Sequence, residues 1–225
     1  MKFAVLGTGI VGRTHAARLK ELKHDVVIGA HDVEKALVAK EPDQMGTPPF
    51  SLWHEEHSDI KVVTFEEAVK HGEIIVEALK GEVVVEALKK LEADINGKIL
   101  IDISNPLDFS KGMPPSLFIS NTDSLGEKIQ RELPQVKVVK TFNTTNAFLQ
   151  VDPMKLKGAD HSIFVSGNDK DAKAKVEELL KSYGWRDIID LGDITTARGT
   201  EMLFPIWLRL WGALQNPMFN FKVVR

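Results

Sequence analysis

The sequence predicts an α/β protein with a Rossmann-type, doubly wound and mostly parallel sheet, followed by a small C-terminal helical extension. Short apolar runs rich in β-branched residues alternate with helical segments, which is typical of a parallel sheet covered by helices on both faces. The first apolar run leads into Gly7, Gly9 and Gly12, in the spacing G-x-G-x-x-G. Together these observations favour a dinucleotide-binding domain.

The expected strands are continuous apolar runs, as strands buried on both faces should be. They cover Lys2–Leu6, Asp25–Gly29, Lys61–Thr64, Glu73–Val76, Lys98–Ile103, Val136–Thr141, His161–Ser166 and Asp187–Leu191.

The expected helices lie between these strands and carry local start and stop signals. Ser124 and Glu127 fit a capping box, and Gly184 is placed to end the helix that starts at Lys170. The polar, proline-bearing stretch from Glu41 to Asp59 predicts a long loop. The helices cover Val11–Leu22, Val33–Ala39, Glu82–Leu91, Ser124–Leu133 and Lys170–Tyr183.

The composition describes an ordinary globular chain of 225 residues, 43% hydrophobic and 27% charged. We expect a NAD(P)-binding domain over residues 1–195 and a helical segment over 196–225. The net charge of −3 gives no electrostatic reason to expect nucleic acid or an anionic membrane as partner. The absence of cysteine excludes disulfides and thiolate chemistry.

The apolar segments are too short to target or span a membrane. The N-terminal run does not resemble a signal peptide. Met202–Leu214 is shorter than the roughly 20 apolar residues of a span, and it contains Pro205 and Arg209. We therefore expect a cytoplasmic, soluble protein.

The glycine loop predicts a pyrophosphate site. Gly7 permits a tight turn, Gly9 leaves room for the pyrophosphate, and Gly12 lets helix and strand pack closely. Amides near Ile10 and Val11 would then point at phosphate from a helix N-terminus. The alternative is a tight strand–helix turn that holds no ligand.

The end of the second expected strand predicts the choice of dinucleotide. An NAD-specific site usually has Asp or Glu there to hold the ribose 2′-hydroxyl, whereas this chain has Ala30. His31 and Lys35 follow and could reach a 2′-phosphate, which favours NADP over NAD. Asp32 either caps the next helix or contacts ribose, and both histidine and lysine could simply be solvated.

Blocks along nearly the whole chain resemble one known family. They are FAVLGTGIVG, HDVVIGAHDVEKA, LIDISNPLDF, VVKTFNTTNAF, FVSGNDKDAK and MLFPIWLRLWGAL. The chain is similar to the NADP-dependent oxidoreductases of the deazaflavin coenzyme F-420 type, to which the cytoplasmic domain of the six-transmembrane metalloreductases is related. The resemblance implies NADP(H) on a Rossmann domain, and direct hydride exchange with coenzyme F-420 or a flavin (FAD or FMN). It also implies that the C-terminal part closes over the second cofactor.

The resemblance also implies a set of cofactor-binding residues. The family commonly has Ser or Thr and then Arg where this chain has Ala30 and His31. The implied set is Gly7, Thr8, Gly9, Ile10, Val11, Gly12, Ala30, His31, Lys35, Ala78, Leu79, Asn105, Pro106 and Asn143.

Polar residues after the fifth and sixth expected strands stand where open α/β sheets place ligands. Asn105 and Asn143 would orient ribose or a carboxamide there, or they serve only in turns. We expect no catalytic acid–base residue, because hydride transfer between bound cofactors depends mainly on alignment and the exclusion of water. His54 and His57 do not form a recognised zinc motif, so no metal is expected.

Two other functions stay open. A dehydrogenase of the 3-hydroxyacid or imine-reducing type shares the N-terminal fold, but such enzymes usually add a large helical domain, and only about 34 residues follow Leu191. The other is a non-catalytic NADP(H) sensor. Residues 200–214 are apolar nearly all round a helix, which predicts burial against the core, a partner chain or a flat ring. A homodimer is therefore expected.

Overall fold

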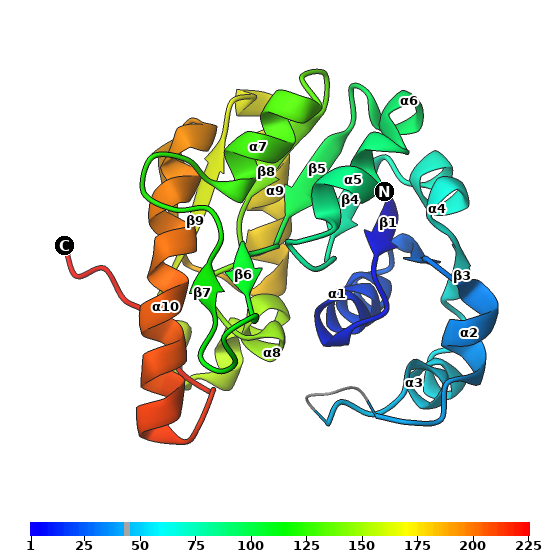
Figure 1. Cartoon of the computed structure of the whole chain (residues 1–225), viewed down its shortest axis with the longest axis horizontal. Coiled ribbons are helices and arrows are strands. Elements are labelled where there is room, and N and C mark those ends of the chain that lie inside the picture. The colour runs from blue at the N-terminus through cyan, green and yellow to red at the C-terminus, as the bar shows by residue number, and fades with distance from the viewer. Residues whose placement is uncertain (43–45) are drawn as a thin grey trace.

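An eight-stranded sheet forms the centre of the molecule, with helices on both faces (Figure 1). The computed structural model describes residues 1–42 and 46–225. The strand order is β10-β9-β8-β5-β4-β1-β2-β3. Every neighbouring pair is parallel except β8 and β9, which are antiparallel. The predicted fold class is confirmed.

The strands of this sheet coincide with the predicted ones, and no end is displaced by more than one residue. Their apolar side chains form the centre of both core clusters. The strands are β1 (Lys2–Leu6), β2 (Asp25–Ala30), β3 (Lys61–Thr64), β4 (Ile74–Glu77), β5 (Ile99–Asp102), β8 (Lys137–Lys140), β9 (Ser162–Gly167) and β10 (Asp187–Gly192). A two-stranded hairpin, β6 (Leu107–Asp108) and β7 (Ser116–Leu117), is too short to show a sequence period.

The helices divide between the two faces of the sheet. One core cluster involves α1 (Ile10–Glu21), α2 (Val33–Val38), α3 (Phe50–Glu56), α8 (Ala147–Val151) and α9 (Lys170–Tyr183). The opposite cluster involves α4 (Phe65–His71), α5 (Val84–Lys89), α6 (Glu92–Ile95), α7 (Leu125–Glu132) and α10 (Ala197–Leu214). Three short 3₁₀ turns cover Pro153–Lys155, Lys157–Ala159 and Ile194–Thr196.

The stretch from Glu41 to Asp59 is not the long loop that its composition predicts. It contains α3, which the sequence analysis missed because polar residues surround its short apolar face. Phe50 is buried in the core, and its ring lies 5.4 Å from that of Trp53. Residues 43–45 of the expected loop lie outside the described residues.

The predicted end of α9 is confirmed, whereas the capping box predicted at Ser124 and Glu127 is present only in part, because the Glu127 side chain does not bond to the Ser124 amide. The Ser124 hydroxyl accepts a hydrogen bond from the Glu127 amide and so caps α7, while the Glu127 carboxylate accepts from the same hydroxyl. Gly184 ends α9 with a φ of +104°, a conformation that suits glycine. A complete capping box stands instead at Thr64 and Glu67, at the start of α4.

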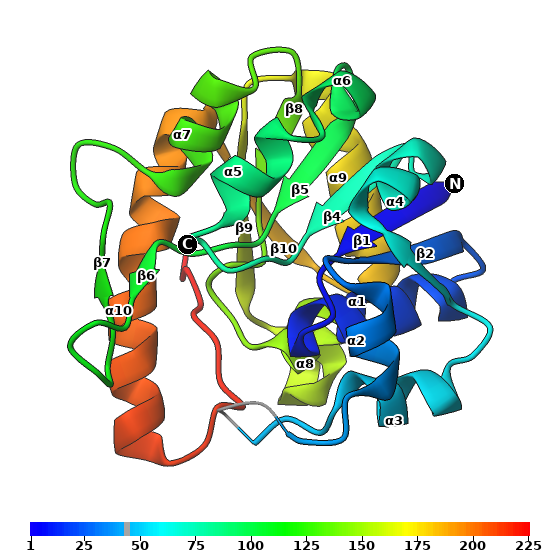
Figure 2. The ribbon, with the colours of Figure 1, turned by 45° about the vertical axis from the view of Figure 1, so that its right-hand side comes forward.

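The C-terminal helix α10 is less buried than its composition predicts. Trp207 is 5% exposed and lies between Phe204 and Phe219, but Met202 and Ile206 are 39% and 46% exposed. Figures 1 and 2 show why: α10 runs past the sheet, beside the β6–β7 hairpin. None of the helices in the described part of the chain has the length and hydropathy needed to cross a membrane.

Candidate functional site

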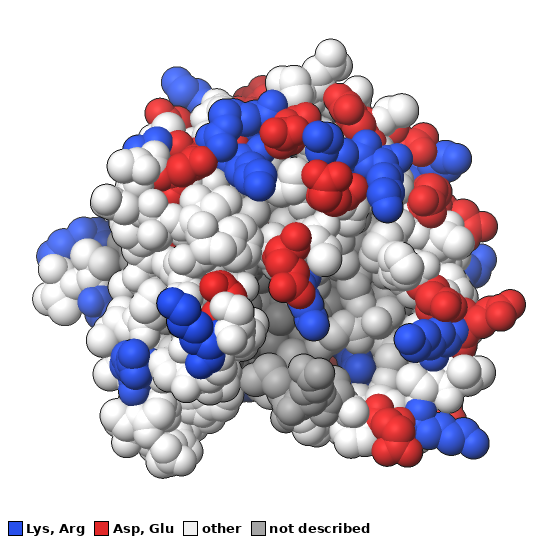
Figure 3. Space-filling model, in the orientation of Figure 1, with Lys and Arg blue, Asp and Glu red and all other residues white. Residues whose placement is uncertain are grey.

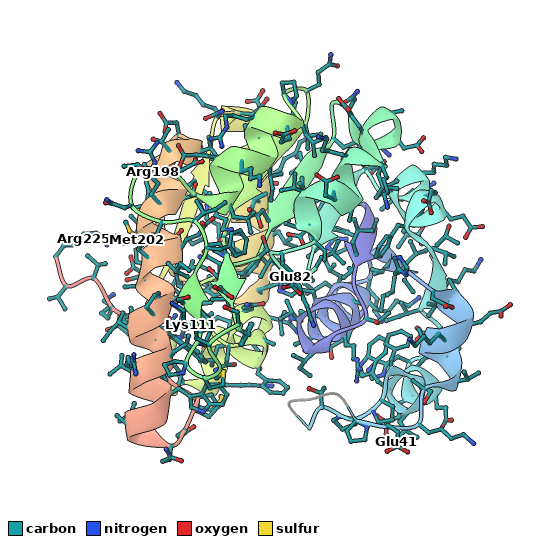
Figure 4. All side chains as sticks on the ribbon, in the orientation of Figure 1. Glu41, Glu82, Lys111, Arg198, Met202 and Arg225 are labelled. Carbon is teal, nitrogen blue, oxygen red and sulfur yellow. The ribbon has the colours of Figure 1, made fainter. Side chains whose placement is uncertain are left out.

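The order of the strands marks one edge of the sheet as a ligand site. The chain leaves β1 for β2 on one side and later returns to β4 on the other side of β1. In open α/β sheets, ligands bind outside the carboxyl ends of the strands at such a reversal. The predicted site residues all lie at the ends of β1, β2, β4, β5 and β8 or in the segments that follow them. Figure 3 shows a hollow near the centre of the viewed face. Glu82, which lies just before α5, stands beside this hollow, as its label in Figure 4 shows.

The glycine loop after β1 has the geometry that a dinucleotide pyrophosphate needs. Gly7 has a φ of +118°, and a Cβ there would lie 2.7 Å from the carbonyl oxygen of Ala78. A Cβ on Gly12 would lie 2.1 Å from the carbonyl oxygen of Gly7. Both positions therefore exclude a side chain, and Gly7 is held directly against the loop after β4.

Gly9 is different, because a Cβ there would have nothing within 4 Å among the described residues. Gly9 is the N-cap of α1, makes no side-chain cap, and precedes a first turn without acidic residues. The amides of Ile10 and Val11 belong to that first turn and have no carbonyl partner within the helix. The N-terminus of α1 thus offers open space and, among the described residues, amides without a partner within the helix, which fits a bound phosphate.

The end of β2 carries no acidic side chain at the position where NAD-specific sites hold the ribose. Ala30 is the last residue of β2 and is 3% exposed. Asp32 caps α2, because its carboxylate accepts a hydrogen bond of 2.9 Å from the Lys35 amide. His31 and Lys35 are exposed beside this turn. Of the two roles open to Asp32, the structure gives it the helix cap.

Arg13 connects the glycine loop to the segment before α3. Its Nε donates to the Thr8 carbonyl at 2.7 Å, and its Nη1 donates to the Pro48 carbonyl at 2.6 Å. The guanidinium also lies over the ring of Phe50, 5.5 Å from the centroid. The region expected to be a loop therefore supports the backbone of Thr8. Arg13 lies one residue beyond the glycine motif, and no sequence pattern marks it as part of the site.

The loops after β5 and β8 are joined by two reciprocal hydrogen bonds. The Asn105 side chain donates to the Asn143 carbonyl at 2.9 Å, and the Asn143 side chain donates to the Asn105 side chain at 3.0 Å. A Cβ on Gly81 would lie 2.1 Å from the Asn105 carbonyl oxygen, so the loop after β4 touches the same point. Pro106 is buried at the base of the β6–β7 hairpin. The structure thus brings together residues that the sequence could only place on separate strands.

A buried charged cluster lies under these loops, and the sequence analysis missed it. It consists of Glu77, Asp102, Lys140 and Glu201, each at most 1% exposed. Burial raises the pKa of the Glu77 carboxyl well above its usual range, and the Asp102 carboxylate raises it further. Burial alone would lower the pKa of Lys140, but the Asp102 and Glu201 carboxylates outweigh it and raise that pKa.

Comparison with known proteins identifies the family. A family model described as NADP oxidoreductase, coenzyme F420-dependent, matches residues 2–106. The chain is 30% identical to the F420-dependent NADP reductase of Methanocaldococcus jannaschii, over 93% of this chain and 92% of that protein. The chain belongs to the coenzyme F420-dependent NADP oxidoreductases.

Solved structures agree with membership of the F420-dependent NADP oxidoreductases. A proposed F420-dependent NADP-reductase from Arthrobacter sp. FB24 is 55% identical, with a TM-score of 0.96 and full coverage of both chains. The NADP-bound pyrroline carboxylate reductase of Plasmodium falciparum shares only the fold, at 15% identity and a TM-score of 0.53. Metalloreductase STEAP3 of Rattus norvegicus is 28% identical over 92% of this chain, which spans 38% of that protein.

Membership of the F420-dependent family confirms the resemblance drawn from the sequence, and with it the prediction of an NADP-dependent oxidoreductase. The individual cofactor-binding residues stay predictions. His54 and His57 have other partners, since their rings bond to the carbonyls of Ile60 and Trp53. In the part of the chain that the structure describes, no three acidic, histidine or cysteine side chains are grouped to hold a metal.

Proposed function

We propose that this protein transfers a hydride between NADP(H) and coenzyme F420 at the carboxyl edge of the sheet. The observation that carries the proposal is the open N-terminus of α1 at Gly9, set where the strand order reverses. Family membership supplies the reaction class. The names of the relatives give F420 as the second cofactor and give no support for FAD or FMN.

The dinucleotide would lie across the edge of the sheet. The first-turn amides of α1 would receive the pyrophosphate, and His31 and Lys35 would face the 2′-phosphate. The backbone around Ala78 and Leu79, together with the Asn105–Asn143 pair, would orient the nicotinamide end. Pro106 would fix the start of the hairpin beside it.

The chemistry belongs to the bound cofactors, because NADPH supplies a hydride and F420 accepts it. The protein would hold the two rings in contact and keep water away from them. The domain division suits this role: residues 1–195 would bind NADP(H), and residues 196–225 would close the second pocket. The exposed apolar side chains of α10 are of the kind that would wall a flat ring.

A spectrophotometric assay tests the proposal. NADPH oxidation is followed with F420, FMN, FAD and a ferric chelate as acceptors, and we expect turnover with F420 to exceed the others. Gly9→Val should remain folded, because the added side chain meets no protein atom within 4 Å. It should nevertheless lose NADPH binding by at least about 100-fold, since it blocks the pyrophosphate.

Two results would contradict the proposal. Turnover only with a flavin or a ferric chelate would mean that F420 is not the acceptor. Normal NADPH affinity in a folded Gly9→Val variant, checked by circular dichroism, would mean that the dinucleotide does not cross this loop.

A further inference from the structure

Three adjacent strands end in charged residues that face one another across the sheet. Glu77, Asp102 and Lys140 are the last residues of β4, β5 and β8, and the strand register pairs Glu77 with Asp102 and Asp102 with Lys140. Charged residues at strand ends usually reach solvent, but the side chains of Asp102 and Lys140 are 0% exposed. Charge inside a protein is unfavourable unless it is paired and hydrogen-bonded, so the arrangement requires an explanation.

Lys140 joins two carboxylates from different parts of the chain. Its Nζ lies 3.0 Å from Asp102 Oδ2 and 2.9 Å from Glu201 Oε1. Glu201 belongs to α10 and also accepts the amides of Leu125 and Gly126, at 2.8 and 3.0 Å. Those amides open α7, so the N-terminus of that helix shares the negative charge. Lys140 thus connects β5 and β8 to both α7 and α10.

The same groups hold the two loops where the nicotinamide end is proposed to lie. Asp102 Oδ1 accepts from the amide and the hydroxyl of Ser104, at 2.9 and 2.7 Å. Lys140 Nζ donates to the Ser104 carbonyl at 2.5 Å. In the neighbouring loop, Glu77 Oε1 accepts from the Leu79 amide at 2.5 Å. Glu77 therefore holds the backbone of Leu79, a predicted cofactor contact. Asp102 and Lys140 hold the backbone of Ser104, which immediately precedes the predicted contact Asn105.

One lysine cannot neutralise three ionised carboxyl groups. Asp102 and Glu201 both bond to Lys140, whereas Glu77 Oε2 is buried and has no donor in the described part of the chain. A buried carboxylate oxygen without a donor is costly. A neutral Glu77 instead carries a proton of its own, which it can donate to the carboxylate of Asp102, its partner in the strand register.

We propose that this buried network, made of Glu77, Asp102, Lys140 and Glu201, positions the redox site. Glu77 takes part as a neutral acid that donates a hydrogen bond to Asp102. The network fixes the position of the loops after β4 and β5 relative to α10, which is proposed to line the pocket of the second cofactor. This inference rests on the proposed function for the identity of the site, but not for the state of Glu77.

Two isosteric substitutions give a matched test, because each replaces one buried carboxyl group with an amide. In Glu77→Gln the amide oxygen accepts from Leu79 and the amide nitrogen donates to Asp102, so every hydrogen bond of the neutral acid is kept. In Asp102→Asn the amide nitrogen must face the Ser104 amide or the Lys140 ammonium, which can only donate, and Lys140 loses a counter-ion. The two variants should therefore differ sharply.

Kinetics and stability are measured for both variants. For Asp102→Asn we expect the rate of hydride transfer to fall by at least about tenfold, because ring alignment is sensitive to small displacements. Its NADPH affinity should change by less than about threefold, since the pyrophosphate loop is untouched. Its midpoint of thermal unfolding should fall by about 5 °C or more. Glu77→Leu should also lose hydride-transfer rate while nearly keeping its affinity for NADPH. Glu77→Gln should instead retain the wild-type rate.

Infrared spectroscopy tests the protonation state without turnover. The difference spectrum between wild type and Glu77→Gln at neutral pH should contain the carbonyl band of a protonated carboxylic acid. The absence of that band, or a Glu77→Gln variant as impaired as Asp102→Asn, would overturn the proposal. Equal losses of rate and of NADPH affinity in Asp102→Asn would also overturn it, because they indicate a structural role alone.

Two further controls keep the test decisive. If Asp102→Asn does not fold, Ser104→Ala takes its place, because it removes one hydrogen bond to Asp102. Its rate of hydride transfer should fall by about threefold while its NADPH affinity stays nearly unchanged. An unchanged rate in that variant would then count against positioning. If wild type fails to reduce F420, the proposed function fails, while the infrared band and the unfolding midpoints still decide the state of the network.

Discussion

At the scale of single residues, we expect the end of β2 to decide which dinucleotide is preferred. Ala30 occupies the position of the ribose-binding acid, and the Asp32 carboxylate caps α2. A 2′-phosphate bound at this turn would meet His31 and Lys35, which are both exposed. Since histidine lacks the fork of arginine, we expect the affinity for the 2′-phosphate to depend mainly on Lys35.

A negative charge at position 30 should change the preference between the two dinucleotides. Ala30→Asp places a carboxylate where the 2′-phosphate would lie, and repulsion should weaken NADPH binding by at least about tenfold while NADH binding is kept or improved. Ala30→Ser adds a side chain without charge and is the matched control, with NADPH still preferred. Titration calorimetry with both dinucleotides measures the change. Equal affinities of wild type for NADPH and NADH would show that this turn does not select the phosphate.

At the scale of elements, a buried histidine joins three helices behind the site. His15 on α1 lies 2.9 Å from the Gln150 side chain of α8 and 3.5 Å from the Tyr183 hydroxyl of α9. Gln150 donates both amide hydrogens to the carbonyls of Phe142 and Thr145, so its oxygen accepts from the histidine. The His15 ring also packs edge-on against Phe142, whose φ of +65° is strained for an aromatic residue. Together these contacts hold the loop that carries Asn143.

His15 should make stability depend on pH. Burial lowers the pKa of His15 from 6.5 to about 4 in the folded protein, so between these values the unfolded chain binds a proton that the folded chain does not. Stability should therefore decrease as pH falls from about 6.5 toward 4, by up to about 3 kcal/mol. Urea unfolding across this range should give a shallower pH dependence for His15→Gln than for wild type.

A variant of the same helix serves as control for the histidine. Leu19→Ala removes a fully buried apolar side chain from α1 and lowers stability without removing a titratable group. It should keep the wild-type pH dependence. Identical slopes for wild type and His15→Gln would assign the pH dependence to other groups.

The elements also show what sequence can and cannot predict. Each main strand is encoded in its own apolar run, and the glycine loop is a local motif, so both were predictable. The helix α3 was missed because Phe50 and Trp53 become an apolar face only when packed. The buried network was missed although IIVE, ILID and VVK each end a strand in a charged residue. Only the register reveals that these residues face one another, and Glu201 joins them from about 60 residues further along the chain.

At the scale of the whole molecule, charged and apolar surfaces are separated. Figure 3 shows Lys, Arg, Asp and Glu crowded over the helices at the top of the view, whereas few charges lie over the far end of α10. Met202, Ile206 and Leu214 of that helix are 39–55% exposed. Phe109, Met113 and Phe118, from the hairpin beside it, are 42–62% exposed. An apolar surface of this kind on a monomer marks an interaction site.

We expect a second copy of the chain to cover this surface, because a helix that is apolar nearly all round otherwise faces water. Sedimentation equilibrium should give a dimer for wild type. Ile206→Lys should shift it to monomer, since a buried, unpaired lysine at the interface is costly. Val38→Lys is the matched control: it also places a lysine at an exposed apolar position, 68% exposed on α2, and should leave the dimer intact. A wild type that sediments as a monomer at every concentration would contradict this prediction.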